Sequence, residues 1–288
     1  MFTPKNNILL PIISDKFRRT DNRLVYIFTN ARDEPNIAEW IAHHILLGFD
    51  KVIVFDHLSV EPIQEQLKTN FDGKLLVKRV QGSGNIKLNL MKDAVNMANR
   101  DNVSWLLYLD ADEFLLLNRF KHVKDFLNYF TNADAIGINW LFFGSSGHVS
   151  QPKGLLTENF IRSELRVDKH VKSFVRPNVV NRIDNPHFFK ITNPSRYYSV
   201  NGTRMNMGPF NFQPLPFIKT ASYIAHYYIQ SEEEHIRRKG RALDDGSANK
   251  TQLVATVHKT YNNVCNNQLQ AKYSNNIKDF LNKYNIVL

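Results

Sequence analysis

The sequence predicts an α/β fold, with a mostly parallel sheet covered by helices on both faces. Over the first half of the chain, short β-rich apolar runs alternate with longer segments whose apolar residues recur at helical spacing. Strands that alternate with helices are joined by right-handed crossovers, which place helices on both faces of the sheet. After Phe143 this regularity ends, and residues 144–220 are rich in Gly, Pro, Asn, Ser and aromatics. We therefore expect an irregular region beside the sheet.

The expected elements follow in order from these signals. Apolar runs predict strands at 24–29, 51–55, 75–80, 105–109 and 135–140. Apolar residues at helical spacing predict helices at 36–47, 62–69, 87–100 and 121–130. A later helix is expected from Ser231, an N-cap residue type followed by three glutamates, to about Gly240.

The length of 288 residues suits one large domain with extensions. We expect a lead-in over 1–22, one domain over 23–250 and a helical tail over 251–288. The apolar run at 8–13 contains a proline and is too short for a membrane span. Cys265 is the only cysteine, and nothing in the sequence marks secretion. We therefore expect a cytoplasmic protein.

The charge favours an anionic partner. Lys and Arg number 37 against 27 Asp and Glu, which gives a net charge of +10. A nucleotide diphosphate, an acidic glycan, a phospholipid surface or a nucleic acid would each suit this excess. Peripheral contact at a membrane surface is compatible with it. The basic residues are spread through the chain, with a modest cluster only at 237–241, so we expect no specific nucleic-acid binding.

Polar clusters follow three of the predicted strands. They are residues 30–34, Asp56 and residues 110–112. In open α/β sheets, ligands bind outside the carboxyl ends of the strands. These clusters are therefore expected to share one edge of the sheet.

The acidic pair Asp110 and Asp112 is the strongest local signal. At a junction of strand and turn, two carboxylates can approach one cation from different angles, and their hard oxygens suit Mg²⁺ or Mn²⁺. Such a cation stabilises the charge that develops when a nucleotide diphosphate leaves a sugar. An Asp-x-Asp triplet is common, and the alternative is a pair of surface carboxylates. The apolar run 105–109 directly before the pair favours the binding role.

Several segments together resemble a known family. They are 31–34 (ARDE), 39–44 (EWIAHH), 47–52 (LGFDKV), 105–114 (WLLYLDADEF), 140–148 (WLFFGSSGH) and 225–240 (AHYYIQSEEEHIRRKG). Their order and spacing resemble glycosyltransferase family 92 and its family-2-like bacterial and viral relatives, over roughly Leu24 to Asp245. The resemblance implies a GT-A fold, a nucleotide-sugar donor, metal dependence and inversion at the anomeric carbon. One departure is Gln230, which stands where the family often has a basic residue, so a phosphate contact there is in doubt.

The resemblance also implies roles for particular residues. His226 would complete the metal site begun by Asp110 and Asp112, although a lone histidine is more often a packing or surface residue. The donor would be a UDP-sugar by family habit, and the acceptor a hydroxyl of a glycan, glycolipid or glycoprotein. The donor-binding candidates are Arg32, Glu34, Asp56, Lys87, Asp110, Arg238, Lys239 and Arg241.

Each donor-binding candidate has a structural alternative. Asp56 would accept the uracil N3–H, or else act as a turn residue ahead of Ser59. Arg32 and Glu34 would contact ribose or phosphate, or else cap the next helix. Lys87 follows a flexible Gly-Ser-Gly-Asn loop that lacks a phosphate-binding motif. The basic residues near 238–241 would clamp the diphosphate, although a basic last helical turn needs no ligand.

An inverting transferase also needs a general base for the acceptor hydroxyl. The segment after the Gly-Ser-Ser-Gly-His loop offers three carboxylates, Glu158, Glu164 and Asp168. We expect Glu158 to be the base, with Asp168 as the next candidate. The alternative for Glu158 is an acid in the first turn of a helix.

Two other classes of function remain open from the sequence. A nucleotidyltransferase acting on sugar phosphates also uses paired carboxylates and a metal. It would require a Gly-rich or basic loop after the first strand, where this chain has Ala31–Pro35. A non-catalytic binder of glycan or nucleic acid would require a basic stripe interleaved with aromatics.

Overall fold

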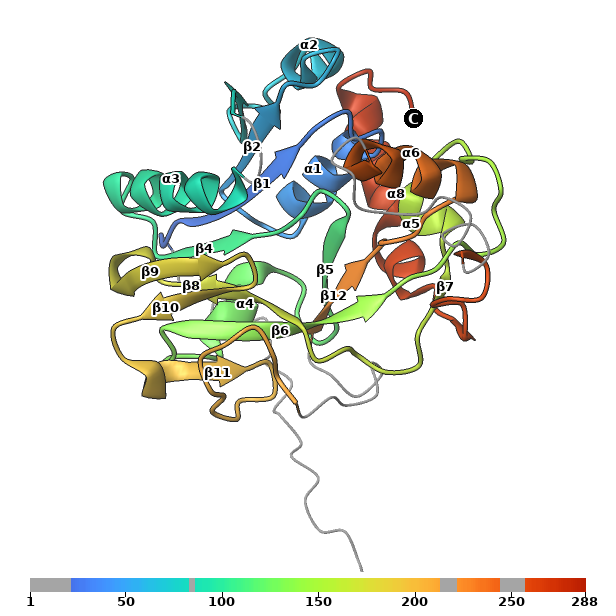
Figure 1. Ribbon diagram of the computed structural model, residues 1–288. Coiled ribbons are helices and arrows are strands. Elements are labelled where there is room, and N and C mark those ends of the chain that lie inside the picture. The colour runs from blue at the N-terminus through green and yellow to red at the C-terminus, as the bar shows by residue number, and fades with distance from the viewer. Residues whose placement is uncertain (1–21, 83–85, 213–221, 244–256) are drawn as a thin grey trace, which may run out of the picture.

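The first half of the chain folds as alternating strands and helices (Figure 1). The computed structural model describes residues 22–82, 86–212, 222–243 and 257–288. The elements up to residue 142 are β1 Val25–Ala31, α1 Ile37–Leu46, β2 Lys51–His57, α2 Ile63–Leu67, β3 Leu75–Val80, α3 Lys87–Arg100, β4 Trp105–Tyr108, β5 Glu113–Leu117, α4 Val123–Asn128 and β6 Ala135–Phe142. The α/β class predicted from the sequence is confirmed. β5 is an additional strand that the sequence patterns did not predict.

The second half contains more regular structure than expected. Its elements are α5 Leu156–Asn159, β7 Arg162–Ser163, β8 Val171–Val175, η1 Pro177–Val179, β9 Val180–Asn185, β10 Phe188–Ile191, η2 Pro194–Arg196, β11 Tyr197–Ser199, β12 Ser222–His226, α6 Glu232–Leu243, β13 Val264–Cys265 and α8 Gln268–Lys283. The prediction of an irregular region over 144–220 was therefore wrong for β8 to β11. These strands are short, and β8 carries a lysine within its apolar run, which hides the strand pattern.

The main sheet is mixed, and five of the eight strand pairs that the described residues form in it are parallel. In the described part of the chain its order is β3-β2-β1-β4-β8-β6-β12-β5, and β11 also pairs with β6. β3, β2, β1 and β4 are parallel neighbours, as predicted. β8 lies antiparallel between β4 and β6, and β5 lies antiparallel to β12. The prediction of a mostly parallel sheet is thus confirmed, and β8 and β5 are the strands that run antiparallel to their neighbours.

Alternating side chains divide the core into two layers. In β1, Val25 and Ile27 belong to one buried cluster, and Tyr26 and Phe28 belong to the other. This alternation follows from the two-residue period of a strand. The first cluster is covered by α1, α4 and α8, and the second by α3 and the β9–β10 hairpin. Burial on both faces explains why the strands read as continuous apolar runs.

The C-terminal helix packs on the main domain. α8 contacts α1 and α5, and its buried side chains share the cluster of α1. These side chains are Leu269, Tyr273, Ile277 and Leu281. A helix in the tail is thus present, whereas the domain limits at 22 and 250 stay predictions, and residues 1–21 lie outside the described residues. No helix in the described part is both long and apolar enough to cross a membrane.

Candidate functional site

A cavity of about 400 Å³ opens at the carboxyl ends of β1 and β4. It is lined by Asn30, Ala31, Arg32, Glu34, Asp110, Ala111, Asp112, Trp140, His226, Tyr228 and Arg238. Six residues selected from the sequence thus line one cavity: Arg32, Glu34, Asp110, Asp112, His226 and Arg238. The ends of β1, β4 and β12, together with helix α6, bring them together (Figure 1).

The two aspartates stand on the tight turn that joins β4 to β5. The Glu113 N–H donates to the Asp110 carbonyl at 3.0 Å. The Asp110 N–H donates to Glu113 Oε2 at 2.9 Å. This closed turn fixes the backbone between two buried strands, so the intervening carboxylates project from a rigid element.

Asp110 is held by two lysines. Lys87, at the start of α3, forms an ion pair with Asp110 Oδ1. Lys172 Nζ lies 3.2 Å from Asp110 Oδ2. Burial alone would raise the pKa of Asp110, but the charges of Lys172 and Lys87 hold that pKa well below its usual range. Asp110 is therefore ionised, and its charge is compensated within the protein.

Lys172 is a site residue that the sequence reasoning missed. Its side chain is 1% exposed, and its Nζ also lies 3.6 Å from Glu113 Oε2. Burial opposes its charge, but Asp110 and Glu113 raise the pKa of Lys172 to about 12. Burial raises the pKa of Glu113 to about 7. A single charged residue inside the apolar run of β8 was the available signal, because a buried lysine requires a charge partner.

Asp112 faces His226 and Arg238. The Asp112 Oδ2 atom lies 3.6 Å from His226 Nε2 and forms an ion pair with Arg238. Burial opposes ionisation of Asp112, but Arg238 and His226 hold its pKa well below the usual range. These two neighbours come from segments that are distant in the sequence.

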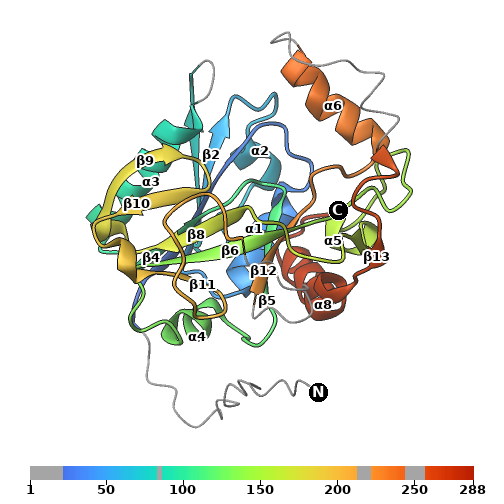
Figure 2. The same ribbon diagram turned by 60° about the horizontal axis from the view of Figure 1, so that its bottom comes forward.

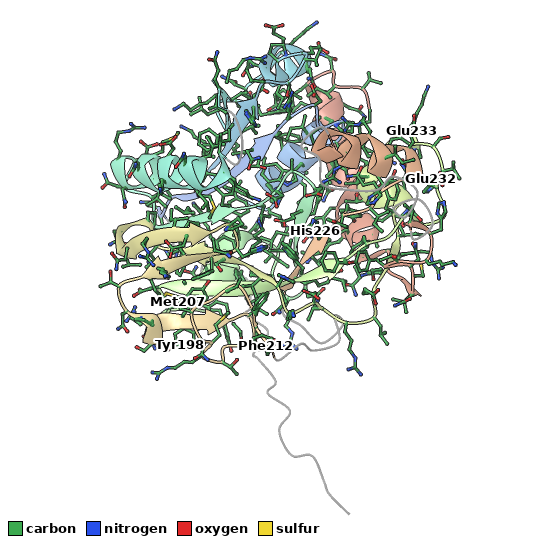
Figure 3. The ribbon with its side chains drawn as sticks, viewed as in Figure 1. Tyr198, Met207, Phe212, His226, Glu232 and Glu233 are labelled. Atoms are coloured by element: carbon green, nitrogen blue, oxygen red, sulfur yellow. The ribbon has the colours of Figure 1, made fainter. Side chains whose placement is uncertain are left out.

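The position of His226 follows from the sheet topology. β12 inserts between β5 and β6, where His226 lies opposite Glu113 on one side and Phe142 on the other. The Tyr227 N–H then donates to the Asp112 carbonyl at 2.9 Å. His226 is 6% exposed, and its ring lies 4.5 Å from that of Trp140. The histidine is thus fixed beside the acidic turn. Figure 3 labels it near the centre of the molecule.

Of the three predicted metal ligands, Asp112 and His226 are the two whose donor atoms lie near each other. Asp112 Oδ2 and His226 Nε2 converge, and carboxylate oxygen and imidazole nitrogen are both competent Mn²⁺ ligands. Asp110 is directed toward its lysines instead. No group of three His, Cys, Asp or Glu side chains in the described residues is arranged to hold a metal. Asp112 and His226 therefore offer two converging donor atoms, of which Asp112 Oδ2 is paired with Arg238 here, and the described residues add no third donor of these types.

Arg238 reaches the cavity from α6. The Ser231 hydroxyl accepts from the Glu234 N–H at 3.1 Å, which caps the helix as predicted. Arg237 donates to the Asp33 carbonyl at 3.1 Å, which ties α6 to the loop after β1. Figure 2 shows α6 at the rim of the molecule. The side chains of Lys239 and Arg241 lie outside the described residues.

The sequence model of glycosyltransferase family 92 matches residues 26–269, which is most of the chain. The chain belongs to glycosyltransferase family 92. A family 92 protein of Oryza sativa subsp. japonica is 24% identical over 245 residues, which cover 81% of this chain and 41% of the relative. One from Ricinus communis is 23% identical over 222 residues, covering 72% and 39%. The chain thus spans about two fifths of the length of these relatives.

Solved structures align more weakly with this family 92 chain. Residues 1–349 of TarS from S. aureus align with 11% identity and a TM-score of 0.38, over 80% of this chain and 68% of that chain. A UDP-glucose pyrophosphorylase complexed with UDP-glucose aligns with 12% identity and a TM-score of 0.32, over 78% and 100%. Alignments this weak do not decide the chemistry.

In this family 92 chain, the Asp56 side chain accepts hydrogen bonds from the backbone of a turn. Asp56 Oδ1 accepts the Ser59 N–H at 2.9 Å, and Oδ2 accepts the Ile63 N–H at 3.1 Å. Arg79 also donates to Oδ2 at 3.0 Å. The side chain is 1% exposed and does not line the cavity. The geometry therefore favours the structural alternative for Asp56 over a contact with uracil.

We expect Asp56→Ala to lower the free energy of unfolding by about 3 kcal/mol, because buried donors lose a charged acceptor. Burial alone would raise the pKa of Asp56, but Ser59, Ile63 and Arg79 lower it. A lowered folded-state pKa stabilises the fold above the unfolded pKa of about 3.9, and this contribution is lost as pH falls through the folded pKa. In urea unfolding, the difference in unfolding free energy between the wild type and Asp56→Ala should therefore shrink below about pH 4.

A specific loss of UDP affinity in Asp56→Ala, with unchanged stability, would contradict this assignment and restore the uracil role. Asp125→Ala is a suitable control, because Asp125 is exposed on α4. Its unfolding free energy should stay close to that of the wild type.

The structure does not bring Glu158 to the cavity. Glu158 Oε1 lies 2.6 Å from Lys278 Nζ on α8. Glu164 accepts from Asn263 at 2.6 Å. Chain position alone favoured Glu158 as the base, whereas the pairing of α5 with α8 turns this carboxylate toward the C-terminal helix. The preference for Glu158 is therefore revised.

Asp168 does not line the cavity either, but it is hydrogen-bonded to a residue that does. Its N–H donates to the carbonyl of Trp140, a lining residue, at 2.6 Å. Its Oδ1 lies 2.5 Å from His170 Nδ1, and the His170 ring stacks on Trp140 at 5.2 Å. Of the three carboxylates, Asp168 is the one attached to the cavity wall.

The remaining candidates have clear positions. Arg32 and Glu34 line the cavity from the loop after β1. Burial raises the pKa of Glu34 to about 7, against the charge of Arg238. Gln230 is fully buried and accepts from Asn36 at 3.3 Å. Gln230 therefore does not line the cavity, which agrees with the doubt about a phosphate contact at this position.

Proposed function

We propose that this chain is a metal-dependent, inverting glycosyltransferase that moves a sugar from a nucleotide diphosphate donor to a hydroxyl group. The donor is a UDP-sugar, and the acceptor is a glycan or another hydroxyl compound. The convergence of Asp112 and His226 in a cavity rimmed by cationic side chains carries the proposal. Membership of family 92 supports it.

Asp112 and His226 would hold the metal ion, which is Mn²⁺ or Mg²⁺. Bound there, the ion would supply positive charge to the departing diphosphate. Asp110 stays ionised next to this pair, with its charge compensated by Lys87 and Lys172. The fixed turn from Asp110 to Glu113 keeps the ligands in place without reorganisation.

The cationic side chains of the cavity suit the phosphates. Arg238 lies beside Asp112 and offers a planar fork of donors, which matches phosphate oxygens. Arg32 lies on the loop after β1, and Glu34 on the same loop suits a ribose hydroxyl. The net charge of +10 agrees with an anionic donor.

Calorimetry of UDP binding tests this donor assignment. With Mn²⁺ present, Arg238→Ala should weaken UDP binding by about 1.5–3 kcal/mol, because a hydrogen bond to a charged group is lost. Removal of Mn²⁺ with a chelator should weaken binding by the wild type as well. Arg182→Ala is the matched control, because Arg182 is exposed on β9 and pairs with Asp184. Equal UDP affinity in the Arg238 and Arg182 variants would count against the assignment.

A further inference from the structure

A line of aromatic rings leads from the cavity to the surface. Trp140 lines the cavity, and the His170 ring stacks on it at 5.2 Å with an interplanar angle of 23°. Phe210 lies 4.8 Å from His170, and Phe212 lies 5.5 Å from Phe210. The rings of Trp140, His170, Phe210 and Phe212, which we call the aromatic track, therefore form a continuous series.

Exposure rises along the aromatic track. Trp140 is 8% exposed, His170 and Phe210 are half-buried, and Phe212 is 71% exposed. Figure 3 labels Phe212 near the lower edge of the molecule, away from His226. An exposed phenylalanine forgoes the burial that stabilises a fold, by about 1.5–3 kcal/mol for a full side chain. A ligand that covers the ring would recover part of this free energy.

Backbone hydrogen bonds hold the aromatic track in place. The Val171 N–H donates to the Pro209 carbonyl at 3.1 Å, and the Asn211 N–H donates to the Lys169 carbonyl at 2.7 Å. The Asn211 side chain donates to Asn139 Oδ1 at 3.0 Å. Residues 209–211 thus lie along the segment before β8, which itself lies along β6. The rings of Trp140, His170 and Phe210 are therefore fixed before any ligand arrives, which reduces the entropy lost on binding.

The polar groups beside the rings suit a sugar chain. A pyranose ring has an apolar C–H face that stacks on an aromatic ring and a rim of hydroxyls that needs hydrogen bonds. The Lys169 ammonium lies over Phe210 at 5.0 Å and over Phe212 at 5.9 Å. Asp168 lies at the inner end, beside Trp140 and His170. Lys169 covers one face of Phe210 and of Phe212, which leaves the opposite face of the exposed Phe212 ring for a sugar and places charged groups at both ends of the track.

We propose that the aromatic track binds the acceptor, an oligosaccharide of at least two pyranose rings. Its inner sugar lies at the cavity edge, next to Trp140 and Asp168, and its outer sugar lies on the exposed face of Phe212. The proposal rests on the glycosyltransferase function proposed above. The continuity of the track with the donor cavity favours an acceptor glycan over a lipid surface, because the inner end leads to the cavity wall that Trp140 forms.

Affinity electrophoresis tests the track, with hydroxyethyl cellulose, galactomannan, xylan and polygalacturonate as probes. We expect at least one polysaccharide to retard the wild type. Phe210→Ala/Phe212→Ala should weaken that retardation about tenfold, the scale of two lost ring contacts. Val60→Ala is the control, since Val60 is 91% exposed on another loop, and its retardation should match the wild type. Thermal melting of Phe212→Ala should match the wild type as well.

The proposal that the track binds glycan is wrong if no probe retards the wild type, or if the double variant is retarded as strongly as the wild type. It is also wrong if the variant instead loses co-sedimentation with phosphatidylserine vesicles, which would indicate membrane contact. UDP calorimetry on the wild type reports on the proposed function separately. If the wild type does not bind UDP but its retardation depends on the two phenylalanines, the aromatic track binds glycan and the proposed transferase function is wrong.

Discussion

Asp112→Asn is expected to lower metal-dependent donor turnover about 10³-fold, which corresponds to about 4 kcal/mol of transition-state stabilisation. Asp112 and His226 converge at 3.6 Å, so loss of one leaves the other without its partner ligand. His226→Ala should have a comparable effect. Because the two residues act as a unit, the double variant should lose little more than either single variant. The rate of nucleotide release from the donor is measured for the two single variants and for the double variant.

Asp125→Asn provides the matched control on an exposed helix position. Its turnover should stay within about twofold of the wild type, as is usual for a surface substitution away from the site. Circular dichroism should show that Asp112→Asn keeps its fold. Normal turnover in folded Asp112→Asn would remove Asp112 from the site.

Asp168→Asn is expected to lower sugar transfer about 10²–10⁴-fold, the usual range for loss of a general base. We propose that Asp168 takes the proton from the acceptor hydroxyl, whose oxygen bonds to the anomeric carbon. The bond from that carbon to the diphosphate breaks on the opposite face. UDP affinity should change little, because the base acts in the transition state.

Glu158→Gln is the comparison, because its carboxylate pairs with Lys278 away from the cavity. We expect a transfer rate within about threefold of the wild type. A steep loss in Glu158→Gln with a normal rate in Asp168→Asn would reverse the assignment. NMR of the product should show a β linkage from an α-configured donor. A retained configuration would contradict the single displacement altogether.

The sequence predicted the parts of the site that depend on local pattern. Apolar runs placed the ends of β1 and β4, and the polar residues that follow them line the cavity. The N-cap at Ser231 placed the start of α6, from which Arg238 points into the cavity. Strand ends and helix caps are short-range features, so one segment is enough to predict them.

The features of the site that the sequence did not predict depend on contacts between distant segments of the chain. β8 enters the sheet from an apparently irregular segment and brings Lys172 to Asp110. The packing of α5 on α8 turns Glu158 toward Lys278. Asp56 had two local interpretations, and the contact with Arg79 on β3 favours the turn. For Lys172 and Glu158 the deciding neighbour lies far away in the sequence, whereas Asp56 also accepts from the nearby Ser59 and Ile63 N–H groups.

Nucleotide release from a panel of nucleotide-sugars tests the central claim most directly. The protein is incubated with each donor and Mn²⁺, without acceptor, and the freed nucleotide is measured. We predict slow release from at least one UDP-sugar. This release should stop when the metal is chelated and should be restored when Mn²⁺ or Mg²⁺ is returned. Release from no donor, or release that persists at full rate after chelation, would contradict a metal-dependent glycosyltransferase.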